Sequence, residues 1–522
     1  MLDLNQIYNI DALEGLKQLD ENSIDAIVSD PPYQLTSTRV YGKETSISEI
    51  SNQLKNNVEE NTAYGSLIKG FMNKSWDVLP SVDILKECLR VLKTGGWALW
   101  LMTPRQDSQL EFMLRLRQAG FNISFSSIEW VYLSGFPKAS NLSILADKRA
   151  CKEDLTHKLN REPTKEEFKE AWSKWREKIA INPSSRPNED RGNVNHLLWK
   201  AGKVAYETKP NSQESKALSG SYSGMQLKPA RELIIVTQKP LAEKTYLDQA
   251  LLHLKDPEHN QLGGTWLNDC KVPYKNETDR LALKRAISPN STSVNGKGGA
   301  FSGTIYGNPT KGFKDNFDMV NGRFPANIIV SDNALDIGIN NKSIASSPNT
   351  EISDSKNIYD FNGGKFYKSG VHYGDSGDLS RYFDLDFWFE NKLKELPEEQ
   401  QKIFPFLYVP KASKSEKNKG LDNLKDQMSL DAFTRFLSTS GDKRNNLMKN
   451  THATVKPIRL MSYLITLTTR ENDIVLDPFI GSGTTAISSI LLKRRFIGFE
   501  REQEYYNIAT ERIKYYQKQE MI

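Results

Sequence analysis

The chain has 522 residues and a formal net charge of +5, which suits roughly two to four domains and neither demands nor excludes a nucleic-acid partner. Its three cysteines and six histidines are scattered, so the sequence predicts a reducing compartment, no disulfide framework and no metal site. No stretch approaches the roughly 20 apolar residues of a membrane span, and no signal-peptide pattern is present, so no membrane association is expected.

Signals for strands and helices alternate over residues 1–138, which predicts a first domain with a parallel sheet covered on both faces. A polar stretch at 36–72 has the composition of a mobile loop. The other expected elements are a strand end and helix start at 8–13, strands at 24–28, 97–102 and 124–133, and helices at 77–91 and 110–119, the first helix ending at Thr94, Gly95 and Gly96.

The character of the chain changes over residues 139–450, which we expect to form an irregular α+β insert. Two stretches, 289–317 and 341–378, have the composition of loops. A capping box at Thr164 and Glu167 predicts a helix whose apolar face carries Phe168, Trp172, Trp175 and Ile179. Basic and aromatic residues are interleaved at 365–368 and 381–383, and lysines recur at 411–419; together they suit phosphate contacts, although a solvated loop explains any single patch better.

The alternating pattern returns over residues 451–522, which we expect to complete the sheet of the first domain. The expected elements are a helix at 457–469, a strand at 473–477, a glycine-hinged turn at 478–485 that leads into a helix, a strand at 495–500 and a closing helix at 505–516. The fold class is therefore α/β, with one sheet assembled from both ends of the chain.

The first chemically distinctive stretch is 29–33, Ser-Asp-Pro-Pro-Tyr, which follows the strand at 24–28. Two prolines end the strand because each fixes φ and lacks an N–H group. Asp30 and the Pro31 carbonyl then offer two acceptors side by side, and Tyr33 offers a stacking face. Because ligands bind beyond the carboxyl ends of parallel strands, this stretch suits a planar amino group with two N–H donors.

The second distinctive stretch is the turn that contains Gly481 and Gly483, between a strand and a helix. Glycines there permit a tight turn and close approach of a ligand to the backbone, but no lysine follows as in a P-loop, and a structural turn alone would explain them. Glu500 ends the next strand and is placed to accept hydrogen bonds from both hydroxyls of a ribose. The combination favours an aminoacyl nucleoside over a dinucleotide.

These two stretches together resemble the DNA amino-methyltransferases that use S-adenosyl-L-methionine. Residues 30–33 match the catalytic Asp-Pro-Pro-Tyr motif, and 477–485 match the cofactor motif D-P-F-x-G-S-G-T-T at every specified position. The catalytic motif comes first, which resembles the permuted β group. Supporting likenesses lie at 11–14, at 90–96 with Thr94 in place of proline, at 452–457 with Ala453 departing from H-P-T-x-K-P, at 495–500, and at 135–138 and 322–327, the last two resembling phage and prophage members with a large central insert.

The resemblance implies a Rossmann-like sheet and assigns roles to particular residues. Asp30 and Pro31 would accept the amino hydrogens of a base swung out of double-stranded DNA, and Tyr33 would stack on that base. Asp11 would lie near the adenine of the cofactor, and Lys456 would hold a loop or the cofactor carboxylate, although a surface lysine explains it equally well. The catalytic set is Asp30, Pro31, Pro32 and Tyr33; the cofactor set is Asp11, Ala12, Asp30, Lys456, Asp477, Pro478, Phe479, Gly481, Ser482, Gly483, Thr484, Thr485 and Glu500.

The resemblance leaves several alternatives open. Asp30, where many cytosine-N4 enzymes carry serine, favours adenine N6 as the methylated atom, with cytosine N4 as the alternative. An RNA or protein methyltransferase, or an inactive DNA-binding homologue, is a further alternative. The expected setting is the cytoplasm of a bacterial or phage-infected cell, with 139–450 as the target-recognition region; a homodimer is left open, and no partner restriction nuclease is identified.

Overall fold

The computed structural model describes residues 2–33, 77–132, 140–181, 206–223, 230–274, 322–331, 384–395, 414–422, 427–428, 447–452 and 454–520. It divides into two units, one formed by 1–133, 231–434 and 447–522 and the other by 134–230 and 435–446. Several sequence predictions lie outside the described residues: the loop at 36–72, the loop regions 289–317 and 341–378, the basic-aromatic stretches 365–368 and 381–383, the family likeness at 135–138, and Ala453.

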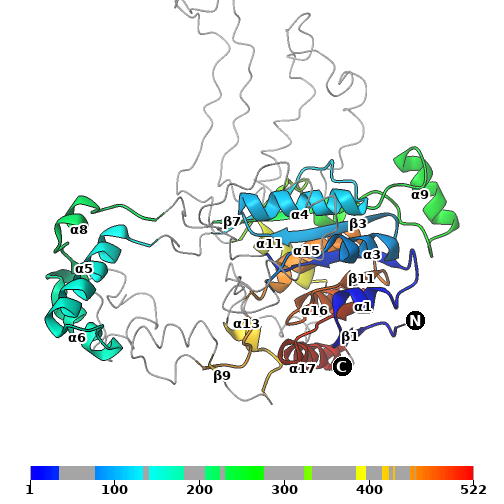
Figure 1. Ribbon diagram of the computed structural model, residues 1–522. Helices are drawn as coiled ribbons and strands as arrows, with labels where there is room; N and C mark the ends of the chain where they lie inside the picture. Colours follow the sequence, from blue (N-terminus) through cyan, green and yellow to red (C-terminus); the bar gives the residue numbers. More distant parts are fainter. Residues whose placement is uncertain are drawn as a thin grey trace, which may run out of the picture. The chain divides into compact units, whose positions relative to one another are not determined.

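The first unit is built on an eight-stranded sheet with the order β1-β12-β11-β2-β3-β7-β4-β8. The first four neighbours come from opposite ends of the chain and are all parallel, as predicted. Figure 1 shows these elements, coloured blue at one end of the chain and orange to red at the other, side by side. The strands are β1 Gln6–Tyr8, β2 Ile24–Ser29, β3 Leu92–Met102, β4 Ile128–Val131, β7 Arg231–Gln238, β8 Ile328–Val330, β11 Ile474–Asp477 and β12 Arg495–Phe499.

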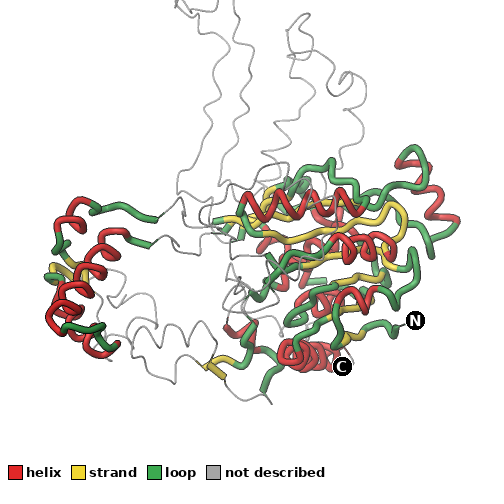
Figure 2. Tube along the Cα trace, in the orientation of Figure 1, coloured by secondary structure: helices red, strands yellow, loops and turns green. Residues whose placement is uncertain are grey.

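Helices cover both faces of this sheet, which confirms the predicted α/β class. One core cluster packs α1 Ala12–Leu16, α3 Val82–Val91 and α4 Gln106–Ala119 against the sheet, and Figure 2 shows these helices layered against the strands. The other cluster packs α11 Leu385–Leu393, α15 Ile458–Thr468, α16 Thr484–Leu491 and α17 Gln503–Glu520. The closing helix places Tyr505, Ile508, Ala509, Ile513 and Tyr516 inward, as predicted.

Two strands of the sheet come from the middle of the chain, so the sheet is not assembled from the chain ends alone. β7 and β8 lie in the segment predicted as an insert, and β7 runs antiparallel to both of its neighbours, β3 and β4. Four consecutive apolar residues of β7, 233–236, pack within the sheet and explain its place there. The wholly parallel sheet expected from the sequence is therefore wrong at this one strand.

The sequence predicts that the glycine pair at 95–96 ends a helix, but in the structure this pair lies inside strand β3. Helix α3 begins after Ser81, whose side chain accepts from the Ile84 N–H group, and β3 starts directly after the helix at Leu92. Gly95 has φ +73°, and the register between β2 and β3 shifts between Ile24 and Ala26. Glycine therefore permits an irregularity near the start of β3 that a residue with a Cβ atom would resist.

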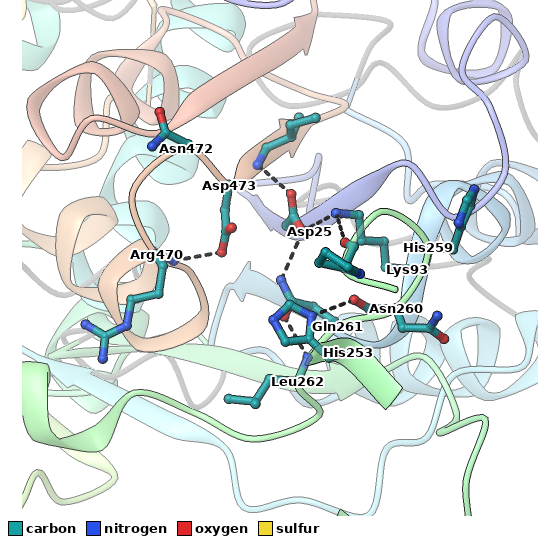
Figure 3. A network of polar contacts seen from close by, with 12 residues as sticks. Asp25, Lys93, His253, His259, Asn260, Gln261, Leu262, Arg470, Asn472 and Asp473 are labelled. Carbon is teal, nitrogen blue, oxygen red and sulfur yellow. Dashed lines mark hydrogen bonds and ion pairs between the residues drawn. The ribbon is translucent and has the colours of Figure 1, made fainter. Parts of the chain in front are cut away.

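A buried polar network links the segment around Gln261 to the edge of the sheet where β2 and β11 begin (Figure 3). The Asp25 carboxylate accepts from Lys93 Nζ at 2.6 Å, from Gln261 Nε2 at 3.1 Å and from the Ile474 N–H group at 2.8 Å. Burial and the nearby Asp25 charge raise the pKa of Asp473 to about 6. The network joins β2, β3 and β11 to the segment after α9 Tyr246–Lys255. It lies at the amino-terminal ends of β2 and β11, opposite their carboxyl ends.

The second unit contains α5 Leu142–Leu159, α6 Lys165–Trp175, β5 Lys178–Ile181, β6 Tyr206–Thr208 and α8 Gln213–Ala217. The predicted capping box at Thr164 and Glu167 is confirmed, but Ile179 lies in β5 and not on the helix face. The helix ends because Arg176 is extended and its guanidinium binds the buried Asp147 carboxylate at 2.6 Å. Burial alone would raise the pKa of Asp147, but hydrogen bonds from the backbone and from Ser215 lower it to about 2.

Among the described residues, no helix is long and apolar enough to cross a membrane. The short strands β9 Gln427–Met428 and β10 Leu447–Met448 form a separate antiparallel pair. The remaining described elements are the 3-10 helix η3 Leu267–Cys270 and α13 Lys414–Asn418.

Candidate active site

Four neighbouring strands of the first unit end at one edge of the sheet, and a polar residue stands at or just after each end. Asp30 follows β2, Asp477 ends β11, Glu500 follows β12 and Asp11 lies shortly after β1. Because the strands β1, β12, β11 and β2 are parallel neighbours, their carboxyl ends meet at the same edge. The side chains that the sequence singled out at both ends of the chain therefore reach one place.

A cavity of about 380 Å³ lies at this edge. Every residue of the predicted catalytic and cofactor sets lines it except Gly483. Additional wall comes from 77–81 and Ile84 before and within α3, from His452 and 454–456, from Met461 of α15, and from Arg501, Glu502 and Tyr505. Asp30 and Gly481, from opposite ends of the chain, therefore line the same cavity, as expected if both chain ends build one sheet.

Asp30 is held at the cavity by two donors. The Tyr33 hydroxyl donates to Oδ1, and Lys456 Nζ lies 2.5 Å from Oδ2 and 2.9 Å from the Tyr33 hydroxyl. Burial raises the pKa of Asp30, and the Lys456 ammonium opposes that rise. Burial also raises the pKa of Tyr33 well above its usual range, so Tyr33 remains a neutral hydrogen-bond donor. The carboxylate is thus preorganised, but both of its oxygens are occupied in this structure.

Lys456 is not a surface lysine. Its side chain is 7% exposed, and its ammonium lies between the carboxylates of Asp30 and Glu232, 3.5 Å from Glu232 Oε2. Burial alone would lower the pKa of Lys456, but these two carboxylates raise it above its ordinary value. Lys456 lines the cavity, as the predicted cofactor set implied. Its contacts with Asp30 and Tyr33 of the catalytic motif were not anticipated from the sequence.

The glycine-hinged turn has two glycines with different surroundings. Gly481 has φ +53° and lines the cavity; a Cβ atom there would lie 2.7 Å from His452 Nε2. Gly483 has φ +83°, and its Cβ position faces Ala509 of α17 at 3.2 Å. Gly481 thus belongs to the wall of the cavity, whereas Gly483 lets α16 begin close against α17 and does not line the cavity.

Asp477 joins the turn to the strand that carries Asp30. Its carboxylate accepts from Ser29 Oγ at 2.6 Å, from Thr485 Oγ1 at 2.5 Å and from the Phe479 N–H group at 3.0 Å. Burial raises the pKa of Asp477 to about 6, although the hydrogen bonds from Ser29 and Thr485 oppose this. Asp477 lines the cavity, and its hydrogen bond from Ser29 also holds the carboxyl ends of β2 and β11 together.

Glu500 and Asp11 supply the remaining acidic groups of the wall. Burial raises the pKa of Glu500 to about 7, although the N–H groups of Glu502 and Gly481 favour its ionised form. Asp11 accepts from the Leu13 N–H group at 2.9 Å and caps α1 while it also lines the cavity. A carboxylate at the end of the strand after the glycine turn fits a ligand with vicinal hydroxyls.

His452 is a neutral part of the wall. Burial, together with the charges of Lys456 and Arg512, lowers the pKa of His452 to about 3. Its ring packs edge-on against Tyr505 with centroids 4.5 Å apart. Among the residues that the structure describes, no group of three or more histidine, cysteine or acidic side chains could hold a metal ion.

A family model described as DNA methylase, of the N6/N4 type, matches residues 24–511. The match spans most of the chain, including both motif-bearing ends. The chain belongs to the N6/N4 DNA methylase family.

Curated relatives match over shorter stretches. Type II methyltransferase M.HindIII of Haemophilus influenzae is 51% identical over 65 residues, which cover 12% of this chain and 21% of the relative. Type II methyltransferase M.HinfI of Haemophilus influenzae is 36% identical over 110 residues, which cover 20% of this chain and 31% of the relative. The matched stretches therefore span about a fifth to a third of these relatives.

Solved structures match over the whole chain at low identity. The PvuII DNA methyltransferase, described as cytosine-N4-specific, is 11% identical with a TM-score of 0.35, and the match covers 99% of this chain and 92% of that one. The fold of this chain is established by its own sheet and helices.

Sequence reasoning missed three contributors to this site. Glu232 comes from β7, whose place in the sheet was not expected. The segment 77–81 was taken as the first turn of a helix, yet it lines the cavity before α3 begins. Tyr505 was predicted as one of the inward residues of the last helix, and it also reaches the cavity. One local signal was available for 77–81: Ser81 is a good helix N-cap, which would have placed the start of the helix after residue 81 and left 77–80 outside it.

Proposed function

We propose that this protein transfers a methyl group from S-adenosyl-L-methionine to the exocyclic amino nitrogen of a base in double-stranded DNA, with adenine N6 as the target atom. Membership of the N6/N4 DNA methylase family supports the reaction class. The observation that carries the proposal is the shared cavity, whose wall combines Asp30 with Gly481 and Glu500. The cofactor supplies an electrophilic methyl group on a sulfonium when it is bound.

The residues at the cavity fit such a cofactor in their chemistry. Glu500 ends a strand and offers carboxylate oxygens to ribose hydroxyls, and Asp11 offers another acceptor nearby. Gly481 leaves backbone accessible in the wall. The other members of the proposed cofactor set that line the cavity are Ala12, Asp30, Lys456, Asp477, Pro478, Phe479, Ser482, Thr484 and Thr485. Gly483 belongs to the set without lining the cavity.

The proposed work of Asp30 is to accept one hydrogen of the target amino group, while the Pro31 carbonyl accepts the other. The amino lone pair of adenine or cytosine is delocalised into the ring, so holding both hydrogens directs it out of conjugation and favours positive charge on nitrogen. Tyr33 and Pro32 supply apolar surface for the base, which must leave the duplex to reach a cavity of this kind. Holding the reactants in line supplies much of the remaining rate.

The permuted order of motifs supports a place in the β group, and the middle of the chain, 139–450, is proposed to recognise the DNA sequence. The likenesses at 135–138 and 322–327 support an origin among phage and prophage enzymes with a large central insert. Such an enzyme would act in the cytoplasm of a bacterial or phage-infected cell. The proposal includes neither a homodimer nor a partner nuclease.

The test offers cofactor carrying a tritiated methyl group together with DNA, RNA or protein, followed by digestion of labelled DNA to nucleosides. Label in N6-methyladenine is the expected result. Label in N4-methylcytosine would show that the target atom is cytosine N4 and not adenine N6, and label only in RNA or protein would overturn the proposed function. Asp30→Ala should abolish transfer. Asp20→Ala, an exposed carboxylate shortly before the same strand, should leave it unchanged.

A further inference from the structure

Glu232 is the second residue of β7 and enters the site from the middle of the chain. It lies opposite Trp130 of β4 in the antiparallel ladder, next to the position where Leu233 faces Met102 of β3. Its Oε1 atom accepts from the Tyr132 hydroxyl at 3.3 Å. Its Oε2 atom is buried and makes no hydrogen bond to any residue that the structure describes.

An acceptor oxygen buried without a hydrogen bond is costly, so its persistence calls for an explanation. The nearest cation is the Lys456 ammonium at 3.5 Å, which lies 2.5 Å from Asp30 Oδ2. One ammonium therefore stands between two carboxylates and is bound closely by only one of them. A short movement of Lys456 would fill the open acceptor of Glu232 and release one oxygen of Asp30.

That release is what the proposed reaction requires. In this structure Tyr33 and Lys456 occupy the two oxygens of Asp30, and the ammonium charge makes Asp30 a poorer acceptor for an amino hydrogen. We propose that Glu232 is a positioning residue for methyl transfer: it takes Lys456 from Asp30 when the amino group of the target base enters. This inference rests on the proposed function.

The same geometry sets the electrostatics at Asp30. Among the residues that the structure describes, Tyr33, Tyr132, His452 and Asp477 are further titratable groups that interact with Asp30, Lys456 or Glu232. Of these, the two tyrosines have pKa values raised by burial and His452 has a lowered one, so all three are neutral near pH 7. Glu232 and Asp30 together offset the Lys456 charge, and the charge of Glu232 raises the pKa of Asp30.

The experiment compares Glu232→Gln with wild type in steady-state methyl transfer across pH, with cofactor and DNA affinities measured in parallel. We expect kcat to fall by about tenfold or more because the amide holds the ammonium less well, while the cofactor Kd changes by less than about twofold. The acid limb of kcat should move to lower pH, because loss of the Glu232 charge lowers the pKa of Asp30. Glu232→Asp keeps the charge and should restore part of the rate.

A double-mutant cycle with Lys456→Gln tests whether Glu232 acts through Lys456. In that background, Glu232→Gln should change kcat by less than about twofold, whereas equal losses in both backgrounds would overturn the inference. Glu129→Gln is the matched control, because Glu129 on the neighbouring strand β4 pairs with Arg231 at the surface. It should leave kcat and the acid limb unchanged. A Glu232→Gln enzyme with wild-type kcat, or with an unmoved acid limb, would also overturn the inference.

Two further measurements separate this inference from the proposed function and from misfolding. A wild-type protein that transfers no methyl group to any acceptor would refute the proposed function. The inference is then decided by the pH dependence of Lys456 acetylation, read by mass spectrometry. Removing the Glu232 charge should lower the pKa of Lys456 and allow labelling at lower pH, and an unchanged profile would overturn the inference. If Glu232→Gln does not fold, Glu232→Asp is measured in the same assays. Its shorter side chain holds the carboxylate farther from Lys456, so kcat, the acid limb and the labelling profile should each shift in the same direction by a smaller amount, and wild-type values for all three would overturn the inference.

Discussion

Replacing Gly481 by alanine should strain the turn for two separable reasons. The residue has φ +53°, a left-handed conformation that costs a residue with a Cβ atom about 1–2 kcal/mol. The new methyl group would also lie 2.7 Å from His452 Nε2, and the His452 ring is buried against Tyr505, so it cannot move aside without repacking. Such overpacking typically costs a further 1–3 kcal/mol, roughly, which gives a total of about 2–5 kcal/mol.

Denaturant unfolding, followed by tryptophan fluorescence, measures this loss of unfolding free energy. Gly220→Ala is a matched control, because Gly220 has φ +82° but no atom within 4 Å of its Cβ position; it should show the backbone cost alone. Adding His452→Ala to Gly481→Ala should recover the steric part, visible as a favourable coupling energy. A Gly481→Ala variant no less stable than Gly220→Ala, or a cycle without coupling, would refute the proposed packing of His452 on the turn.

Two pH-dependent predictions follow from the acidic residues of the cavity wall. Because the pKa of Glu500 is raised to about 7, this group stabilises the ligand-free fold at low pH, an effect that is lost as the pH rises through about 7. Ribose hydroxyls would favour the ionised form, so cofactor affinity by calorimetry should improve up to about tenfold from pH 6 to 8. Glu500→Gln should flatten that profile, and a profile unchanged in the variant would contradict the assignment. Ser29→Ala should cost about 1–3 kcal/mol of unfolding free energy by removing a buried donor to Asp477. Since this donor favours ionised Asp477, whose pKa is about 6, the loss should be larger at about pH 8 than at about pH 5; equal losses would be the contrary result.

The sequence could predict that Asp30 and Gly481 share a cavity because their positions follow from local signals and one rule of sheet geometry. Each residue follows a short apolar strand, and parallel strands present their carboxyl ends at one edge. It did not matter that 451 positions separate them, because β11 and β2 are neighbours in the sheet. The residues of both motifs could therefore be named without knowing how the middle of the chain folds.

The sequence could not place Glu232, because strand β7 gains its position from pairing with β3 and β4 far away in the chain. Its apolar run is short and lies among segments of loop-like composition, so local patterning favoured an irregular insert. The glycine pair at 95–96 misled for the opposite reason: a helix followed by glycines usually ends there, but pairing with β2 and β7 draws the chain directly into β3. Both errors arise where tertiary contacts outweigh local preference.

The hydrogen bond between Ser29 and Asp477 explains why the site can form although the strand that carries Asp30 comes before the strand that leads into the glycine turn. Ser29 is the last residue of β2 and Asp477 the last of β11, and the bond fixes the carboxyl ends of these two strands directly to each other. The cavity therefore depends on which strands are neighbours and on their parallel direction, and not on which strand the chain forms first. A chain that visits β2 before β11 builds the same wall as one that visits them in reverse, provided that the connections can span the helices on either face.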